Sequence, residues 1–354
     1  MEKIYIGPNN LANISERIEK SLTSKDIKAD FITWSNTLHP FNYGKHKTFK
    51  LVNKPPFKIM GKNIFFFFNE YFLKAIYFLF ALIKYDVFLF IKPVTFLKNN
   101  IDLKILKFFN KKVGIFNVGC HDRDVKFDTD PEYICNTCTD IVLQEYCFCN
   151  DIEKKVAEAN FFAKYSNYVF GTPDNVSYIK DKSKVYNLVV GAPEIIIKAS
   201  TKNFRSRIKI SHLPSNSLVK GTHLIEPVLN RLANEEDLEI VIKKGIWSRE
   251  KIIKEISESH ILIDSLAGYI FGTICLEAIQ YGCVPLNAYP KWISSNYSIP
   301  IVVKVTGDSL YSTLKELINN RELLEQHAAR CQEAYNKYFT FESAGFYLKE
   351  ILEL

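Results

Sequence analysis

The sequence lacks most of the motifs that would place it in a familiar enzyme class. It has no P-loop, no HExxH sequence, no kinase motif and no Ser-His-Asp order. After the first expected strand, Ile6-Gly-Pro-Asn-Asn has one glycine where a dinucleotide-binding fingerprint needs three. It also has no repeat of fixed period, and its only low-complexity tract is the phenylalanine run at 65–68, so solenoids and propellers are excluded.

A long uncharged apolar run is also missing. The segment Ile64–Ile91 is rich in Phe, Leu and Tyr, but its longest uncharged run, Ala75–Ile83, has nine residues, against roughly 18 for a membrane span. The interrupting residues are Asn69, Glu70, Lys74 and Lys84. We therefore expect a helix buried in a large domain; docking of its Phe/Lys-rich face on a membrane surface is the alternative.

The amino-terminal stretch MEKIYIGPNN is typical of a strand, because its apolar part is short and Glu2 precedes it, so a signal peptide is not expected. The protein is accordingly expected in the cytoplasm, with the inner face of the cytoplasmic membrane as an alternative. The formal charge of +7 suits an anionic substrate or membrane surface, but the basic residues are too dispersed to indicate nucleic acid.

The composition is that of a folded protein, with 24% charged and 47% hydrophobic residues in 354. At about 150 residues per domain, the length predicts two domains. Short apolar runs alternate with helical patterns, which is typical of parallel sheets covered by helices on both faces. In the first half we expect strands at 3–6, 29–33, 86–91, 113–118, 168–170 and 185–190, and helices at 11–22, 71–83, 101–109 and 152–165.

A second series of strands and helices begins at Arg207. We expect strands at 208–211, 238–242, 261–263 and 284–286, and helices at 222–233, 249–258, 271–281 and 310–338. Periodicity is lost over Ala192–Arg207, which is the expected linker. The tail after Thr340 has an apolar stripe of Phe346, Leu348, Ile351 and Leu352 that needs a surface to cover. The domains are predicted at 1–195 and 196–338, with a helix at 339–354 crossing back to the first.

The strongest functional pattern is Gly268-Tyr-Ile-Phe-Gly-Thr-Ile-Cys-Leu-Glu-Ala-Ile-Gln-Tyr-Gly-Cys-Val-Pro285. Gly272 and Thr273 stand where a helix should begin, and free N–H groups at such a start favour an anion such as a diphosphate. Glu277 lies on an otherwise apolar helix, where a buried carboxylate needs a partner, so we expect it to accept hydrogen bonds from sugar hydroxyls.

This pattern resembles that of the family-4 retaining glycosyltransferases, whose signature is Glu, seven residues, Glu, then Ala and a Gly-x-Pro turn. Glu277 matches the second acid, which in that family holds the nucleotide ribose. Tyr269 occupies the place of the first acid, and Asp264, after a predicted strand, is a nearby replacement.

An upstream loop, Ser211-His-Leu-Pro-Ser-Asn-Ser-Leu-Val-Lys-Gly-Thr222, extends the resemblance. In the family this region often reads Gly-Arg, four residues, Lys-Gly, with both cations on the diphosphate. Lys220 and Gly221 match, Ser215 stands at the Arg position, and Asn216 follows it. Lys243 or Lys244, directly after the next strand, is expected to supplement the single matching cation.

The resemblance implies the GT-B fold, in which two Rossmann-like domains face each other across a cleft. It also implies transfer of a hexosyl-type sugar from a nucleotide-sugar donor, with retained configuration and no metal at the diphosphate. The expected acceptor is a glycan or lipid-linked sugar of a bacterial-type surface polymer, with no catalytic cofactor. A non-catalytic nucleotide-sugar or glycan-binding protein and a nucleotide-sugar epimerase are the alternatives.

The first half contains a loop of ionisable residues, Gly119-Cys-His-Asp-Arg-Asp124, at the carboxyl end of an expected strand. In family-4-like enzymes the corresponding loop contacts the donor sugar and acceptor. We expect His121, Asp122 and Arg123 to act in catalysis with Lys220, and Asp124 to lie beside them. A salt-bridged loop without chemistry is the competing interpretation.

Five of the eight cysteines lie within 30 residues: Cys120, Cys135, Cys138, Cys147 and Cys149. Four thiolates in a reducing cytoplasm are typical of a structural zinc site, and a metal would order a segment that has little apolar content. Free thiols and a disulfide or redox pair remain alternatives. Cys275, Cys283 and Cys331 are expected to be small apolar residues of the core.

Overall fold

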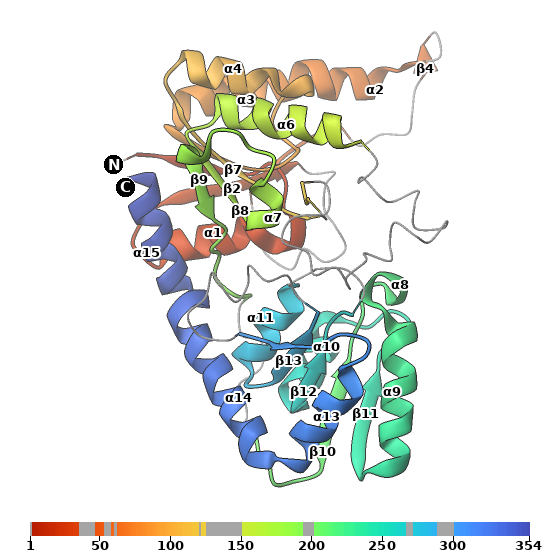
Figure 1. Cartoon of the computed structure of the whole chain (residues 1–354). Helices are drawn as coiled ribbons and strands as arrows, with labels where there is room; N and C mark the ends of the chain where they lie inside the picture. Colours follow the sequence, from red (N-terminus) through yellow and green to blue (C-terminus); the bar gives the residue numbers. More distant parts are fainter. Residues whose placement is uncertain are drawn as a thin grey trace. The chain divides into compact units, whose positions relative to one another are not determined.

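The computed structural model of the chain describes residues 2–34, 47–52, 58–59, 62–119, 122–124, 151–193, 202–266, 272–288 and 301–354 (Figure 1). These residues form two compact units. Unit 1 contains the described residues up to Asp124, those from 151 to Gly191, and the tail Phe341–Leu354. Unit 2 contains the described residues between Ala192 and Thr340.

Unit 1 is built on a seven-stranded parallel sheet with the order β3-β2-β1-β6-β7-β8-β9. Its strands are β1 (Ile4–Ile6), β2 (Ala29–Trp34), β3 (Lys47–Phe49), β6 (Val87–Ile91), β7 (Lys112–Phe116), β8 (Tyr168–Gly171) and β9 (Val185–Asn187). A separate antiparallel pair joins β4 (Lys58–Ile59) and β5 (Lys62–Asn63). Strand β6 is buried along its whole length, as expected of a strand covered on both faces.

Helices cover both faces of this sheet. They are η1 (Leu11–Asn13), α1 (Ile14–Thr23), α2 (Ile64–Phe67), η2 (Phe68–Leu73), α3 (Lys74–Lys84), η3 (Lys98–Asn100), α4 (Ile101–Phe108), α6 (Ile152–Tyr165), α7 (Pro173–Val176), η6 (Lys182–Lys184) and α15 (Phe341–Leu352). Leu89 and Ile91 of β6 pack with α1 and α15, whereas Phe88 and Phe90 pack with α3, α4 and α6. Successive side chains of one strand thus serve two cores.

The helical segment formed by α2, η2 and α3 is not the buried helix that the sequence analysis predicts. A window of 18 residues within Phe65–Lys84 has a mean hydropathy of 1.5, and only 17% of that window is buried inside the protein. By length and composition the segment could cross a membrane. The prediction was wrong because the segment is apolar on two sides, and the sheet covers only one of them.

The tail packs on the first unit, as the sequence analysis predicts. Leu348 and Leu352 of α15 are fully buried in the core shared with α1, while Phe346 is 62% exposed and does not belong to the buried stripe. At Gly345 the helix comes so close to α1 that an added Cβ would lie 2.0 Å from the Ser21 carbonyl oxygen. The tail is therefore a structural part of unit 1.

Unit 2 is a five-stranded parallel sheet with the order β11-β10-β12-β13-β14. Its strands are β10 (Ile208–His212), β11 (Leu238–Ile242), β12 (Ile261–Ile263), β13 (Val284–Asn287) and β14 (Val303–Lys304). Its helices are α8 (Ser217–Lys220), α9 (Thr222–Glu235), α10 (Arg249–Glu258), α11 (Thr273–Gln280), α13 (Leu310–Asn319), α14 (Arg321–Ala334) and η7 (Tyr335–Phe339). Helices α9, α13 and α14 pack on one face, and α10 and α11 pack on the other.

The long helix expected at 310–338 is broken. Asn320 leaves the helical conformation, and its side chain accepts a hydrogen bond from the Leu323 backbone N–H at 3.0 Å. Asparagine is a preferred residue at such a position because its side chain satisfies a backbone donor that the helix start leaves free. The segment therefore forms α13, α14 and the π-helical turn η7.

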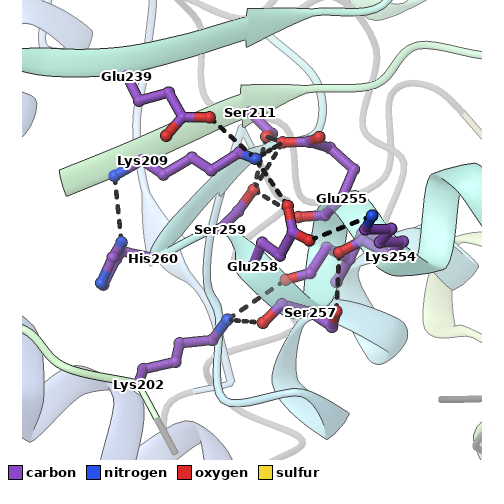
Figure 2. A network of polar contacts seen from close by, with 11 residues as sticks. Lys202, Lys209, Ser211, Glu239, Lys254, Glu255, Ser257, Glu258, Ser259 and His260 are labelled. Atoms are coloured by element: carbon purple, nitrogen blue, oxygen red, sulfur yellow. Dashed lines mark hydrogen bonds and ion pairs between the residues drawn. The ribbon is translucent and has the colours of Figure 1, made fainter. Parts of the chain in front are cut away.

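A polar network ties α10 to the sheet of unit 2 (Figure 2). The Nζ atom of Lys209 on β10 lies 3.0 Å from carboxylate oxygens of Glu239 on β11 and of Glu255 and Glu258 on α10. Burial lowers the pKa of Lys209, but hydrogen bonds to these carboxylates outweigh it and raise the pKa above its usual value. The network holds α10, whose first residue is Arg249, against β10 and β11.

Candidate functional site

The loop after β10 is organised by Asn216 and Gly221. The Asn216 side chain accepts hydrogen bonds from the backbone N–H groups of Leu218 at 3.0 Å and Val219 at 3.2 Å, so it caps α8. Gly221 then adopts φ +72°, a left-handed conformation that glycine enters at little cost, between α8 and α9. This turn directs the Lys220 side chain toward β12.

Lys220 and Asp264 form an ion pair in unit 2. The Lys220 Nζ atom lies 2.5 Å from Asp264 Oδ1, and their residues are 8% and 4% exposed. Asp264 follows directly after β12, and the Lys220 carbonyl accepts a hydrogen bond from the Leu266 N–H. The two predicted site residues are thus together at the carboxyl edge of a parallel sheet, where open α/β sheets bind their ligands.

Three further residues surround the Asp264 carboxylate. Its Oδ2 atom accepts hydrogen bonds from Asn287 Nδ2 at 3.1 Å and from Cys275 Sγ at 3.3 Å. An added Cβ at Gly272 would lie 3.1 Å from Asp264 Oδ2 and 3.3 Å from Lys220 Nζ. The start of α11 therefore lies directly against the ion pair, and glycine provides the necessary space.

His212, the last residue of β10, holds the loop in place. Its Nδ1 atom lies 2.8 Å from the Ile263 carbonyl oxygen, and its Nε2 atom lies 2.8 Å from Thr222 Oγ1. A carbonyl oxygen can only accept, so Nδ1 carries the proton and Nε2 accepts from the Thr222 hydroxyl. Burial lowers the pKa of His212 below its usual value, which favours this neutral form.

Glu277 is 2% exposed and forms an ion pair with Arg249, the first residue of α10. The Arg249 Nη2 group donates to Glu277 Oε1. Glu277 follows Cys275 by two residues on α11, so its side chain leaves the helix on a different side from the one that contacts Asp264. Arg249 is a site residue that the sequence analysis missed.

An open groove of about 780 Å³ lies at the ends of β10 and β11. Ser215, Asn216 and Lys243 line it, together with His223 and Lys244. The Lys243 Nζ group donates to the carbonyl oxygen of Pro214, which also lines the groove, at 2.9 Å. The predicted residues of this loop therefore divide between the groove and the Lys220–Asp264 ion pair.

Tyr269 lies outside the described residues, and Thr273 is the first residue of α11. In unit 1, His121 also lies outside the described part of the chain. Asp122 is buried in an ion pair with Lys92, and the Arg123 Nε atom lies 3.0 Å from Asp174 Oδ2.

Asp124 belongs to the same polar group of unit 1. It donates its backbone N–H to the Asp174 carbonyl oxygen at 2.8 Å and accepts from Ser177 Oγ at 3.1 Å. The described residues of the loop, 122–124, therefore all make polar contacts with other residues of unit 1.

Solved structures resemble the chain over its whole length. Anabaena HepE, solved in complex with UDP-glucose, is 12% identical with a TM-score of 0.59, and both chains are covered completely. TarM is 11% identical with a TM-score of 0.62, covering 100% of this chain and 99% of its own. Sucrose-phosphate synthase from Thermosynechococcus elongatus is 10% identical with a TM-score of 0.62, covering 100% and 98%.

The chain has the GT-B fold. This confirms the fold class that the sequence analysis predicts. No protein-family model matches the chain, and no curated protein matches it in sequence. At identities of 10–12%, the structural likeness shows a shared fold alone. The function therefore has to be argued from the site itself.

The five clustered cysteines, Cys120, Cys135, Cys138, Cys147 and Cys149, lie outside the described residues, so their zinc site stays a prediction. Among the residues that the structure describes, no group of three or more His, Cys, Asp or Glu side chains is arranged to hold a metal ion. Cys275, Cys283 and Cys331 are free and buried, as predicted.

The candidate site also includes Arg249, Asn287 and His212, which the sequence analysis did not predict. Arg249 opens the helix that follows β11, so its place after a strand at the carboxyl edge was available from the sequence. Asn287 ends β13 and His212 ends β10, and the same rule applies to them. Their partners, however, come from other strands and helices, and no local pattern identifies them.

Proposed function

We propose that the protein is a glycosyltransferase whose unit 2 binds a nucleotide-sugar donor. The observation that carries this proposal is the ion pair between Lys220 and Asp264, which lies against the start of α11 at the carboxyl edge of the sheet. A cation and the free N–H groups of a helix start together suit a diphosphate. The structural neighbours support it, since HepE was solved with UDP-glucose and a TarM variant with UDP.

Lys220 is the proposed contact of the diphosphate. Its ammonium group has an anionic partner in Asp264, and a diphosphate would compete with that carboxylate for the same charge. When the bond from the anomeric carbon to the diphosphate breaks, negative charge grows on the leaving phosphate. A cation held in place before the reaction stabilises that charge, and so lowers the barrier to transfer.

Glu277 is the proposed acceptor of hydrogen bonds from the ribose. Its buried carboxylate is stabilised by Arg249, which also fixes the orientation of the side chain. Arg249 is thus proposed as a positioning residue for nucleotide binding. The proposed nucleotide-sugar site is completed from the loops after β10 and β11 by Ser215, Asn216, Gly221 and Lys243. Tyr269, which precedes α11 in the sequence, and Thr273, the first residue of α11, are the remaining proposed members.

The finer details of the reaction are proposals that rest on the family resemblance. They are transfer of a hexosyl-type sugar with retained configuration, no metal at the diphosphate, and His121, Asp122 and Arg123 of unit 1 in catalysis. The proposed acceptor is a glycan or lipid-linked sugar of a bacterial-type surface polysaccharide, used at the cytoplasmic side. A TarM complex with fondaparinux and α-GlcNAc-glycerol supports a glycan acceptor.

A protein that binds a nucleotide sugar without transferring it is the second candidate. Ser215 replaces the arginine of the family pattern, Tyr269 replaces its first acid, and Asp264 already neutralises Lys220. These features reduce the positive charge available to a leaving diphosphate. An epimerase would need additional carboxylates and histidines, and these features do not supply them.

A binding and turnover experiment separates these candidates. The full chain is titrated by calorimetry with UDP-, GDP-, ADP- and CMP-linked sugars, and donor hydrolysis is followed with EDTA present. We expect one nucleotide class to bind, and Glu277→Gln to weaken that binding about tenfold or more, since a hydrogen bond to a charged group contributes about 1.5–3 kcal/mol. Tight binding without hydrolysis or transfer favours the second candidate, and no binding by any donor contradicts both.

A further inference from the structure

An apolar stripe on α2, η2 and α3 of unit 1 is exposed. Phe72, Ile76, Leu79, Phe80 and Ile83 recur at spacings of four, seven, eight and eleven residues, which places them on one side of a helix. Their exposed fractions run from 45% at Ile76 to 86% at Ile83. A surface helix normally has polar residues on this side, so the stripe needs an apolar environment outside the protein.

The opposite side of the same helix is fixed to unit 1. Phe78 and Ala81 are buried in the core between the helix and the sheet, and the Tyr77 hydroxyl donates to the Lys50 carbonyl oxygen at 2.9 Å. Asn69 exchanges two hydrogen bonds with the backbone of Val52, at 2.9 and 3.0 Å. Leaving the sheet to cross a bilayer would expose this core and break these bonds, so the helix is held at the protein surface.

Helix α4 continues the exposed surface. Leu103 and Leu106 pack into the same core as α3, while Phe108 at the end of α4 is 80% exposed and Phe109 is 54% exposed. Figure 1 draws α3 and α4 over the same side of the unit 1 sheet. We define the exposed apolar surface as the exposed side chains of α2, η2, α3 and α4 with Phe109.

The charges around this surface are mainly positive. Lys98, Lys104 and Lys107 are exposed on η3 and α4. Lys98 lies over the ring of Tyr71, and Lys104 and Lys107 lie near the ring of Tyr165. Tyr71 is 54% exposed, and a lysine beside an exposed aromatic residue is typical of surfaces that rest in the headgroup region of a bilayer.

The acidic residues of the same helices do not cancel this charge. Glu70 is paired with Lys74 within its own helix. Asp102 is fully buried and accepts hydrogen bonds from Thr95 and from the backbone of Phe96. Among the residues that the structure describes, Lys98, Lys104 and Lys107 form no ion pair with a carboxylate. The surface thus combines apolar side chains with unbalanced lysines, which complements an anionic lipid layer.

We propose that the exposed apolar surface docks unit 1 on an anionic bilayer, with α3 lying in the plane of the interface and not spanning the bilayer. The exposed stripe enters the boundary between headgroups and acyl chains, and the lysines contact lipid phosphates. Charge complementarity favours this occupant over a second copy of the chain, because two such surfaces would bring lysines of the same sign together. The proposal does not depend on transfer activity.

Vesicle sedimentation tests the proposal with the full chain. Vesicles of phosphatidylcholine alone are compared with vesicles that also contain phosphatidylglycerol. We expect binding to the anionic vesicles and its loss at high salt. Leu79→Ser/Ile83→Ser removes apolar contacts, and Lys104→Glu/Lys107→Glu removes the charge attraction; each double variant should reduce the partition coefficient about tenfold or more.

Ile246→Ser is the matched control, because Ile246 is 96% exposed in unit 2 and lies outside the surface. It should bind vesicles as the unaltered chain does, and all variants should keep their melting temperature. Equal vesicle binding by both double variants and the control overturns the proposal. Resistance of the bound protein to alkaline carbonate extraction would also overturn it, because such resistance indicates a spanning helix. A third contrary result is a chain that binds no vesicles but forms a dimer in light scattering, which Leu79→Ser/Ile83→Ser disrupts.

Discussion

Lys220 and Asp264, which are 44 positions apart in the sequence, form a buried ion pair at the carboxyl edge of the unit 2 sheet. Asp264 receives further hydrogen bonds from Asn287 and Cys275, so its position is fixed from two other elements. Lys220, by contrast, has one carboxylate partner within this cluster, and the proposed function requires a ligand phosphate to take the place of that partner. The fixed carboxylate keeps the Lys220 ammonium group at the carboxyl edge of the sheet, which is where the proposed function places the diphosphate.

Replacing Lys220 tests this arrangement. Lys220→Met should weaken binding of the preferred nucleotide sugar about tenfold or more, because a charge-assisted hydrogen bond to the diphosphate is lost. Calorimetry measures the affinity. Lys254→Met is the matched control, since Lys254 is an exposed lysine of the same unit that pairs with Glu258 within α10 and lies outside the groove. Similar affinities of the two variants would exclude Lys220 as the phosphate contact.

The pH dependence of stability tests the role of His212. Its pKa is lowered in the folded protein from 6.5, so the unfolded chain binds the proton more readily. Stability contributed by the neutral imidazole is therefore present above about pH 6.5 and is lost as the pH falls toward the folded-state pKa. We expect His212→Asn to melt at a lower temperature than the unaltered chain at pH 7.5, and this difference to shrink at pH 5.5.

The control for this experiment is His223→Asn, because His223 is exposed on α9. Scanning calorimetry of the three proteins at both pH values gives the comparison. A difference between His212→Asn and the unaltered chain that is the same at both pH values would show that the His212 proton does not contribute.

Gly345 tests the packing of the tail on unit 1. In an ordinary helix, replacing glycine by alanine stabilises the fold by up to about 1 kcal/mol. Gly345→Ala should instead lower the free energy of unfolding by about 1–3 kcal/mol, because the new Cβ meets the backbone of α1 at Ser21. Urea unfolding measures the change, with the exposed Glu342→Ala of the same helix as a control. Stabilisation by Gly345→Ala would contradict the close contact.

The cysteine cluster predicts about one zinc ion per chain. Four of Cys120, Cys135, Cys138, Cys147 and Cys149 are the proposed ligands. Elemental analysis of protein purified without added metal measures the zinc content, and Cys135→Ser/Cys138→Ser should abolish it. Cys331→Ser is the control, because Cys331 is a buried cysteine of unit 2 that is far from the cluster in the sequence. Zinc well below one per chain, with freely titrating thiols, would leave the free-thiol interpretation.

The periodicity of the sequence was sufficient to predict the α/β class and several elements to the residue. Helix α6 at Ile152–Tyr165 and strand β11 at Leu238–Ile242 have the predicted bounds, since capping residues and alternating apolar runs act over short distances. Placing Lys220 and Asp264 after strands of one parallel sheet also predicted that both would reach the same edge.

Pairing and exposure depended on the tertiary structure. Arg249 and Glu277 meet because α10 and α11 pack side by side, and Asp122 meets Lys92 because their loops follow neighbouring strands. The segment from α2 to α3 is apolar on two sides, and periodicity cannot say which of these the sheet will cover. Local patterns arise from a residue's own neighbours in the chain, whereas burial and partners depend on elements brought together from distant positions.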